Sequence, residues 1–102
     1  MKEGTILIID NDIGSNDIAE NFLNQAGYET FACKIALDGI KIIKEKFNEI
    51  ILVLLEPSLK NSTLLIKTIK ENKRYAHIKL IIYLSKTIKL MDYEDPINYF
   101  KF

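Results

Sequence analysis

The stretch Ile50-Ile-Leu-Val-Leu-Leu-Glu-Pro57 decides the fold of this chain. Six apolar residues follow one another without a break, and a carboxylate and a proline come directly after them. An apolar run of this length, rich in branched residues and closed by a proline, is typical of a strand buried on both faces. Such a strand lies in the middle of a parallel sheet that has helices on either side. We therefore expect the rest of the chain to cover this strand or to form a site at its carboxyl end.

The composition is that of a single globular domain, which we expect to span residues 1–102. Hydrophobic residues make up 48% of the chain and charged residues 27%, which is ordinary for a globular protein of this size. Fourteen basic residues balance fourteen acidic ones. The chain therefore lacks the basic surplus with which nucleic-acid-binding proteins hold phosphates, and the sequence predicts no nucleic-acid partner.

Three features of the sequence indicate a cytoplasmic protein. The start, Met1-Lys-Glu-Gly4, lacks the apolar region of a signal peptide. No segment approaches the roughly 20 apolar residues that cross a bilayer, so no membrane partner is expected. Cys33 is the only cysteine, which excludes an intramolecular disulfide and a site built from several cysteines.

Apolar runs alternate with apolar stripes of helical spacing along the chain. This alternation predicts an α/β fold with an open five-stranded parallel sheet and helices on both faces. The sequence stops at the end of the fifth predicted strand, so no final helix is expected. Gly27 is the predicted left-handed cap of the first helix. The predicted strands are Ile6–Ile9, Tyr28–Cys33, Ile50–Leu55, Leu80–Leu84 and Ile97–Phe102, and the stripes of the intervening helices are Ile18, Phe22, Leu23 and Ala26, then Ala36, Ile40, Ile43 and Phe47, then Leu65, Ile66 and Ile69.

Polar residues follow three of the predicted strands. Asp10-Asn11-Asp12 comes after the first strand, Glu56 after the third and Ser85 after the fourth. Ligands of open parallel sheets bind at the carboxyl ends of the strands, where the strand order reverses. The sequence therefore places its candidate site at this edge of the sheet.

Two segments resemble response-regulator receiver domains of the chemotaxis-regulator type. Ile6-Leu-Ile-Ile-Asp-Asn-Asp12, followed by a helix that ends in Gln25-Ala-Gly-Tyr28, is similar to the opening of these domains. The stretch from Leu65 to Ile78 is similar to their third helix and its exit. The resemblance covers residues 5 to about 85 and implies the flavodoxin-like topology of a receiver. It also implies a two-component, phosphorelay signalling module that is not itself an enzyme.

The resemblance implies a role for the acidic cluster after the first strand. Receiver domains transfer a phosphoryl group to an aspartate at the end of the third strand, with a Mg²⁺ ion that neutralises charge on the phosphate oxygens. Asp10 matches the first of their two metal-binding acidic positions, Asn11 takes the second, and Asp12 matches a frequent third acidic residue. Asn11 offers an oxygen without a charge, so it is a poorer ligand for a hard cation. We therefore expect a remnant pocket without a cofactor, and leave open a weak Mg²⁺ site at Asp10.

The phosphoacceptor aspartate is missing where the resemblance implies it. Receiver domains have a proline four residues after the acceptor. Counting back from Pro57 gives Val53, and a shift of one residue gives Leu54; neither side chain is a nucleophile. The resemblance thus indicates an atypical member, a pseudo-receiver. The alternatives for Glu56 are a displaced acceptor or a solvated carboxylate at the strand end.

The tail holds the remaining candidate switch residues. Ser85 is similar to the hydroxyl residue after the fourth strand of receivers, although an ordinary turn serine is the alternative. Lys101 is similar to the lysine of their fifth strand, with Phe102 in place of the usual proline. Tyr99 lies two residues before Lys101, where receivers have an aromatic residue three before it.

The predicted fifth strand also indicates how the protein finds partners. An edge strand with exposed Tyr99, Phe100 and Phe102 invites pairing with, or burial by, another chain. A protein partner, self-association and a missing continuation of a longer protein are the three explanations. Three functions follow: a pseudo-receiver that works by phosphorylation-independent protein contact, a phosphorylatable receiver that uses Glu56 or Asp10, and a self-associating structural module.

Overall fold

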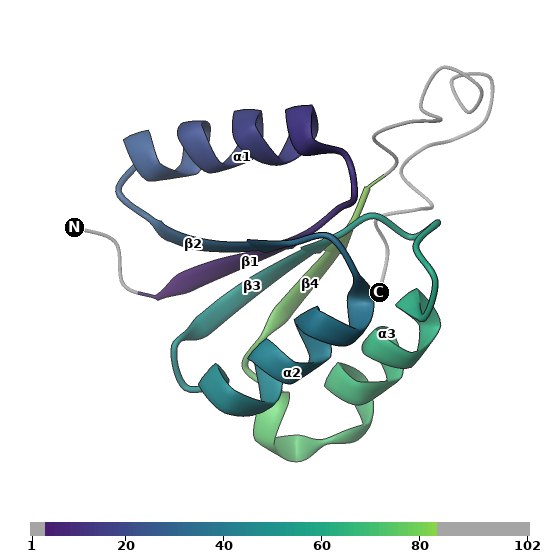
Figure 1. Cartoon of the computed structure of the whole chain (residues 1–102). Helices are drawn as coiled ribbons and strands as arrows, with labels where there is room; N and C mark the ends of the chain where they lie inside the picture. Colours follow the sequence, from purple (N-terminus) through teal and green to yellow (C-terminus); the bar gives the residue numbers. More distant parts are fainter. Residues whose placement is uncertain (1–3, 84–102) are drawn as a thin grey trace, which may run out of the picture.

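Strands and helices alternate along the chain in the computed structural model, which describes residues 4–83 apart from the side chain of Ser15 (Figure 1). This order confirms the α/β class that the sequence predicts. None of the helices in the described range is long and apolar enough to cross a bilayer. The elements are β1 (Thr5–Ile9), α1 (Ile13–Gln25), β2 (Glu29–Cys33), α2 (Ala36–Lys46), β3 (Ile50–Leu55), α3 (Ser62–Glu71), the 3-10 turn η1 (Lys73–Tyr75) and β4 (Lys79–Ile82).

The sheet is parallel throughout and has the strand order β2-β1-β3-β4. Ile9 at the end of β1 pairs with Cys33 of β2 and with Leu55 of β3, so the carboxyl ends of these three strands lie at one level. Helix α1 covers one face of the sheet, and α2 and α3 cover the other (Figure 1).

The prediction of a five-stranded sheet is wrong, because the sheet has four strands over residues 4–83. β4 is hydrogen-bonded to β3 on one side only, so β4 is the edge of the described sheet. The segment predicted as the fifth strand, 97–102, lies outside the described residues.

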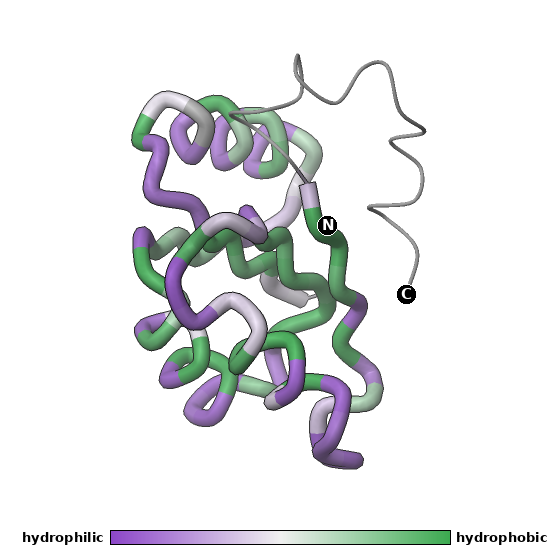
Figure 2. The backbone as a smooth tube through the Cα atoms, turned by 90° about the vertical axis from the view of Figure 1, so that its right-hand side faces the viewer, coloured by the Kyte–Doolittle hydropathy of each residue, from purple (hydrophilic) through white to green (hydrophobic). Residues whose placement is uncertain are grey.

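The main core lies between the sheet and the α2–α3 layer. Strand alternation sends every second residue of β1 and β3 to this side, and these side chains are fully buried against both helices. The green segments of Figure 2 show this hydrophobic centre. The strand that is buried on both faces is β1, whereas Leu52 and Leu54 of β3 are half-buried on the α1 side. The core cluster contains Leu7, Ile9, Ala36, Ile40, Ile43, Ile50, Val53, Leu55, Leu59, Leu65, Ile69, Tyr75, Ile78 and Ile82.

Helix α1 leaves most of its apolar stripe in solvent. Ile18 is 73% exposed and Phe22 is 71% exposed, whereas Asn16 is buried and Leu23 half-buried. The helix packs on β2 and β1, and the predicted stripe extends beyond the side that this contact covers. On the same face of the sheet, Ile81 of β4 is also exposed. The α1 side is therefore the less completely packed of the two layers.

Gly27 ends α1 as the sequence predicts. Its φ of 96° is left-handed, a conformation that glycine adopts without steric cost. The amide of Tyr28 donates to the carbonyl of Leu23 at 3.0 Å, and the amide of Gly27 donates to that of Asn24 at 3.0 Å. These two bonds form a Schellman cap and direct the chain from α1 into β2.

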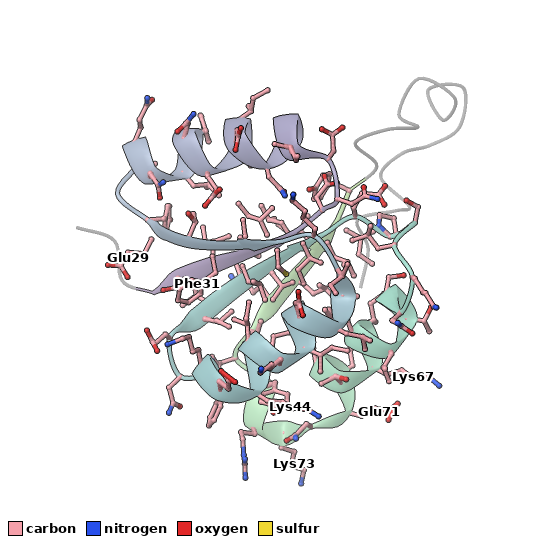
Figure 3. All side chains as sticks on the ribbon, in the orientation of Figure 1. Glu29, Phe31, Lys44, Lys67, Glu71 and Lys73 are labelled. Carbon is pink, nitrogen blue, oxygen red and sulfur yellow. The ribbon has the colours of Figure 1, made fainter. Side chains whose placement is uncertain are left out.

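Lysines on α2, α3 and η1 lie on a solvated surface, as the charge pattern of the sequence indicates. Figure 3 shows Lys44, Lys67, Glu71 and Lys73 in the lower part of the view, on and around α2 and α3. All four side chains are exposed. Opposite charges that are exposed on a helix surface contribute little to stability.

Gly39 allows α2 to approach the sheet and α3. A Cβ atom built on Gly39 would lie 2.4 Å from Cδ1 of Ile9 and 3.1 Å from Cδ1 of Leu65. Both neighbours are fully buried, so neither has room to move freely. This close packing explains why glycine stands inside a helix, where it costs about 1 kcal/mol relative to alanine.

We expect Gly39→Ala to lower the free energy of unfolding by about 1 kcal/mol, because overpacking costs about 1–3 kcal/mol and exceeds the gain in helix propensity. Urea denaturation followed by circular dichroism measures this change. Gly14→Ala is the matched control, since a Cβ there meets only Oδ1 of Asp12, at 3.4 Å. The control should leave stability unchanged or raise it. A Gly39→Ala variant more stable than the parent would contradict the packing argument.

Candidate functional site

The carboxyl ends of β1 and β3 bring Asp10 and Glu56 together. Asp10 follows β1 and Glu56 follows β3, whose last residues, Ile9 and Leu55, are paired in the sheet. The amide of Glu56 donates to the carbonyl of Ile9 at 3.0 Å, which extends the ladder by one residue. Both side chains are almost completely buried, with 0% of Asp10 and 1% of Glu56 exposed. Two adjacent carboxylates out of water require hydrogen-bond donors.

Tyr83 supplies one of these donors from the end of β4. Its amide donates to the carbonyl of Leu55 at 3.1 Å, and its hydroxyl donates to Oδ2 of Asp10 at 2.7 Å. Burial, this hydrogen bond and the negative charges of Asp10, Glu56 and Asp12 raise the pKa of Tyr83 well above its usual range. The phenol therefore remains a protonated donor.

Tyr83 was not among the residues that the sequence analysis singled out. The sequence gives little signal for it, because the predicted strand runs to Leu84 and places Tyr83 inside the strand. The structure ends β4 at Ile82, which puts Tyr83 at the edge of the sheet where the carboxylates lie.

The loop after β1 also orients Asp10. The amide of Asp12 donates to Oδ1 of Asp10 at 2.9 Å. Nδ2 of Asn16, which is buried at the start of α1, donates to the main-chain oxygen of Asp10 at 2.7 Å. Asn16 therefore ties the first turn of α1 to the end of β1.

Glu56 is tied to the loop that follows it. Its Oε2 accepts hydrogen bonds from the amide of Ser58, at 2.7 Å, and from the hydroxyl of the same residue. Its Oε1 is buried and has no hydrogen-bond partner in the part of the chain that the structure describes. The alternative of a solvated carboxylate is therefore wrong, because only 1% of Glu56 is exposed.

Val53 and Leu54 do not lie at this site. Val53 pairs with Leu7 and Leu80 and is fully buried in the core between the sheet and the helices. Leu54 is also inside β3, which ends at Leu55. Only Glu56 separates the end of β3 from Pro57, so the residue four positions before Pro57 lies inside the strand. Glu56 is the first residue after the strand, as the sequence predicts.

The remaining predicted site residues lie around the cluster or beyond the described range. Asp12 is half-buried beside Asp10, and Asn11 is exposed. Ser85, Tyr99 and Lys101 lie outside the residues that the structure describes. Within residues 4–83 there is no group of three or more His, Cys, Asp or Glu side chains arranged to hold a metal ion.

Cys33, at the end of β2, is a poor nucleophile. Burial, the nearby Asp38 charge and, in the opposite direction, a hydrogen bond to Ile35 together raise the pKa of Cys33 to about 11. The thiol donates to the carbonyl of Ile35 at 3.6 Å. The reactive thiolate is therefore scarce at neutral pH.

We expect Glu56→Gln to raise the free energy of unfolding by about 1 kcal/mol, because it removes a buried negative charge next to Asp10 and Asp12. The amide oxygen of the glutamine can still accept the two hydrogen bonds from Ser58. Thermal and urea unfolding at neutral pH measure the change. Glu45→Gln is the control, since Glu45 is exposed on α2 and its change should alter stability by less than about 0.5 kcal/mol. A destabilised Glu56→Gln variant would contradict the argument from buried charge.

Two solved structures that resemble this chain are receiver domains. A signal receiver domain from Vibrio parahaemolyticus matches with a TM-score of 0.64 and 14% identity, over 89% of this chain and 72% of that one. A response regulator receiver protein from Pseudomonas putida matches with a TM-score of 0.65 and 16% identity, over 91% and 78%. No protein-family model and no curated protein sequence matches the chain. At this level of identity the comparison establishes the fold: the chain has the flavodoxin-like α/β fold of response-regulator receiver domains.

Proposed function

We propose that this chain is a receiver-like module of two-component signalling that acts through phosphorylation-independent contact with a protein partner. The observation that carries the proposal is the enclosure of the Glu56 carboxylate. The place at the end of β3 holds a buried glutamate whose Oε2 is already bonded twice to Ser58. A carboxylate that is enclosed and tied in this way is a poor target for an incoming phosphodonor. On this proposal the protein is a cytoplasmic binding module and not an enzyme.

The donor set at the cluster does not suit Mg²⁺. A hard cation of this size needs several oxygen ligands that converge in a nearly octahedral arrangement. Here Oδ2 of Asp10 accepts from the hydroxyl of Tyr83, Oδ1 accepts from the amide of Asp12, and Oε2 of Glu56 faces Ser58. Donors that carry hydrogen toward these oxygens occupy directions that a cation would need. The proposal therefore includes no metal cofactor.

We expect acetyl phosphate or beryllofluoride with Mg²⁺ to leave the amide NMR spectrum unchanged, because the carboxylates of Asp10 and Glu56 are enclosed and hydrogen-bonded. The same samples, analysed by intact mass, should show no added phosphoryl group. The amides near Asp10, Glu56 and Ser85 are the ones to follow. Added phosphoryl mass would reject the proposal in favour of the alternative, a phosphorylatable receiver. Loss of that mass in Glu56→Gln, but not in the Glu45→Gln control, would then assign the acceptor to Glu56.

Self-association as a structural module is the second candidate function. Exposed apolar side chains on α1, Ile18 and Phe22, together with the exposed Ile81 on the same side of the sheet, favour it. Three aromatic residues outside the described range, Tyr99, Phe100 and Phe102, are the other candidate contacts. Either surface would be covered by a second copy of the chain.

If the chain self-associates, we expect sedimentation to show a dimer whose fraction rises with protein concentration. Phe22→Ser should weaken the dimer if α1 forms the interface, because it removes a large exposed apolar side chain. Asn21→Ser, which changes the exposed polar neighbour, is the matched control and should leave the dimer unchanged. A strict monomer at high concentration would remove this candidate and leave contact with a different protein.

A further inference from the structure

A cleft of about 350 Å³ lies at the same edge of the sheet as the carboxylates but has a different lining. Its residues come from the loops after β1, β2 and β3 and from the start of α2, and they include none of Asp10, Asp12, Glu56 and Tyr83. The strand order β2-β1-β3-β4 reverses between β1 and β3, which is where ligands enter open parallel sheets. The volume is at the small end of the roughly 300–1,000 Å³ typical of ligand pockets. The lining residues are Asn11, Lys34, Ile35, Ala36, Leu37, Leu59, Lys60 and Asn61.

Two of the apolar side chains that line this cleft lie outside the core. Ile35 is 54% exposed and Leu37 is 51% exposed, and both lie at the start of α2. Leu59, which is nearly buried, approaches from the loop after β3. Large apolar side chains that are left in solvent around a concave surface are characteristic of a binding site.

The rim of the cleft is positively charged. Lys34 and Lys60 are both exposed and come from the loops that precede α2 and α3. The lining contains no carboxylate, and neither lysine has an ion pair among residues 4–83. Among the lining residues, an anion would therefore meet two cations and no carboxylate, and the nearest acidic side chain on α2 is Asp38 in its first turn.

The N-termini of two helices lie near the same two lysines. Ile35 is the N-cap residue of α2 and Asn61 that of α3, and neither side chain caps its helix by a hydrogen bond. Uncapped first-turn amides carry partial positive charge and accept anionic groups. The amide of Ser62 at the start of α3 already donates to the carbonyl of Leu59 at 3.1 Å, so the positive charge at this place comes mainly from the two lysines and the start of α2.

We propose that this cleft binds a small organic anion, with an apolar body against Ile35, Leu37 and Leu59 and a carboxylate or phosphate group between Lys34 and Lys60. The inference does not depend on the proposed function, because Glu56 does not line the cleft. It gives the chain a way to respond to a metabolite-sized ligand at the edge where the carboxylate cluster also lies.

The test is amide NMR titration of the full chain with three probes that share an apolar body: naphthylacetate, naphthyl phosphate and the neutral naphthylethanol. Saturable shifts of the amides of Ala36, Leu37 and Asn61 with at least one anion support the proposal. The anion should bind about fivefold or more tightly than the alcohol, and the preferred anion separates carboxylate from phosphate ligands. Shifts confined to Leu54 and Ile81, equal affinity for the alcohol, or no saturation would overturn the proposal.

Charge-removing variants test the two lysines. Lys34→Gln and Lys60→Gln should each weaken the anion by about two- to fivefold, the range for exposed ion pairs, and leave the alcohol unaffected. Lys44→Gln is the control, because Lys44 lies on α2 away from the cleft and points outward (Figure 3). All three side chains are exposed, so folding should be preserved. An equal loss in the control would mean that only net charge matters and would reject the site.

Discussion

The burial of two carboxylates at the ends of adjacent parallel strands is the constraint on which the rest of this site depends. Asp10 and Glu56 are held side by side because β1 and β3 pair in register up to Ile9 and Leu55. An unsatisfied polar group in the interior costs about 1–3 kcal/mol, and a charged one costs more. The loops after β1, β3 and β4 therefore supply donors: the amide of Asp12, both donors of Ser58 and the hydroxyl of Tyr83.

This constraint separates the chemistry of the cluster from that of a solvent-exposed acceptor site. The hydrogen bonds at Asp10 and Glu56 orient oxygens toward protein donors, and a side chain that is fully enclosed meets a diffusing reagent only after the loop opens. The neighbouring cleft differs in each of these respects. It is open, apolar and rimmed by lysines. One edge of the sheet thus presents a closed anionic site beside an open cationic one.

The two layers of the fold also differ in how completely they are packed. On the α2–α3 side, Gly39 permits an approach that leaves no room for a methyl group, and the core there is continuous. On the other side, α1 covers β2 and β1 and leaves Ile18, Phe22 and Ile81 exposed. A face of this kind favours contact with another surface.

The sequence by itself determined the α/β class, the existence of the four strands and three helices of residues 4–83 and the Gly27 cap, because hydrophobic period and glycine conformation are local properties. It also placed Asp10 and Glu56 at strand ends. Only the tertiary structure decided that the Glu56 side chain is buried and bonded to Ser58, since a position at a strand end does not specify what surrounds the side chain. Likewise, the partnership of Tyr83 with Asp10 joins residues 73 positions apart, and the exposure of Ile18 depends on which elements pack beside α1. Long-range contacts of this kind follow from strand order and register, which a local pattern does not specify.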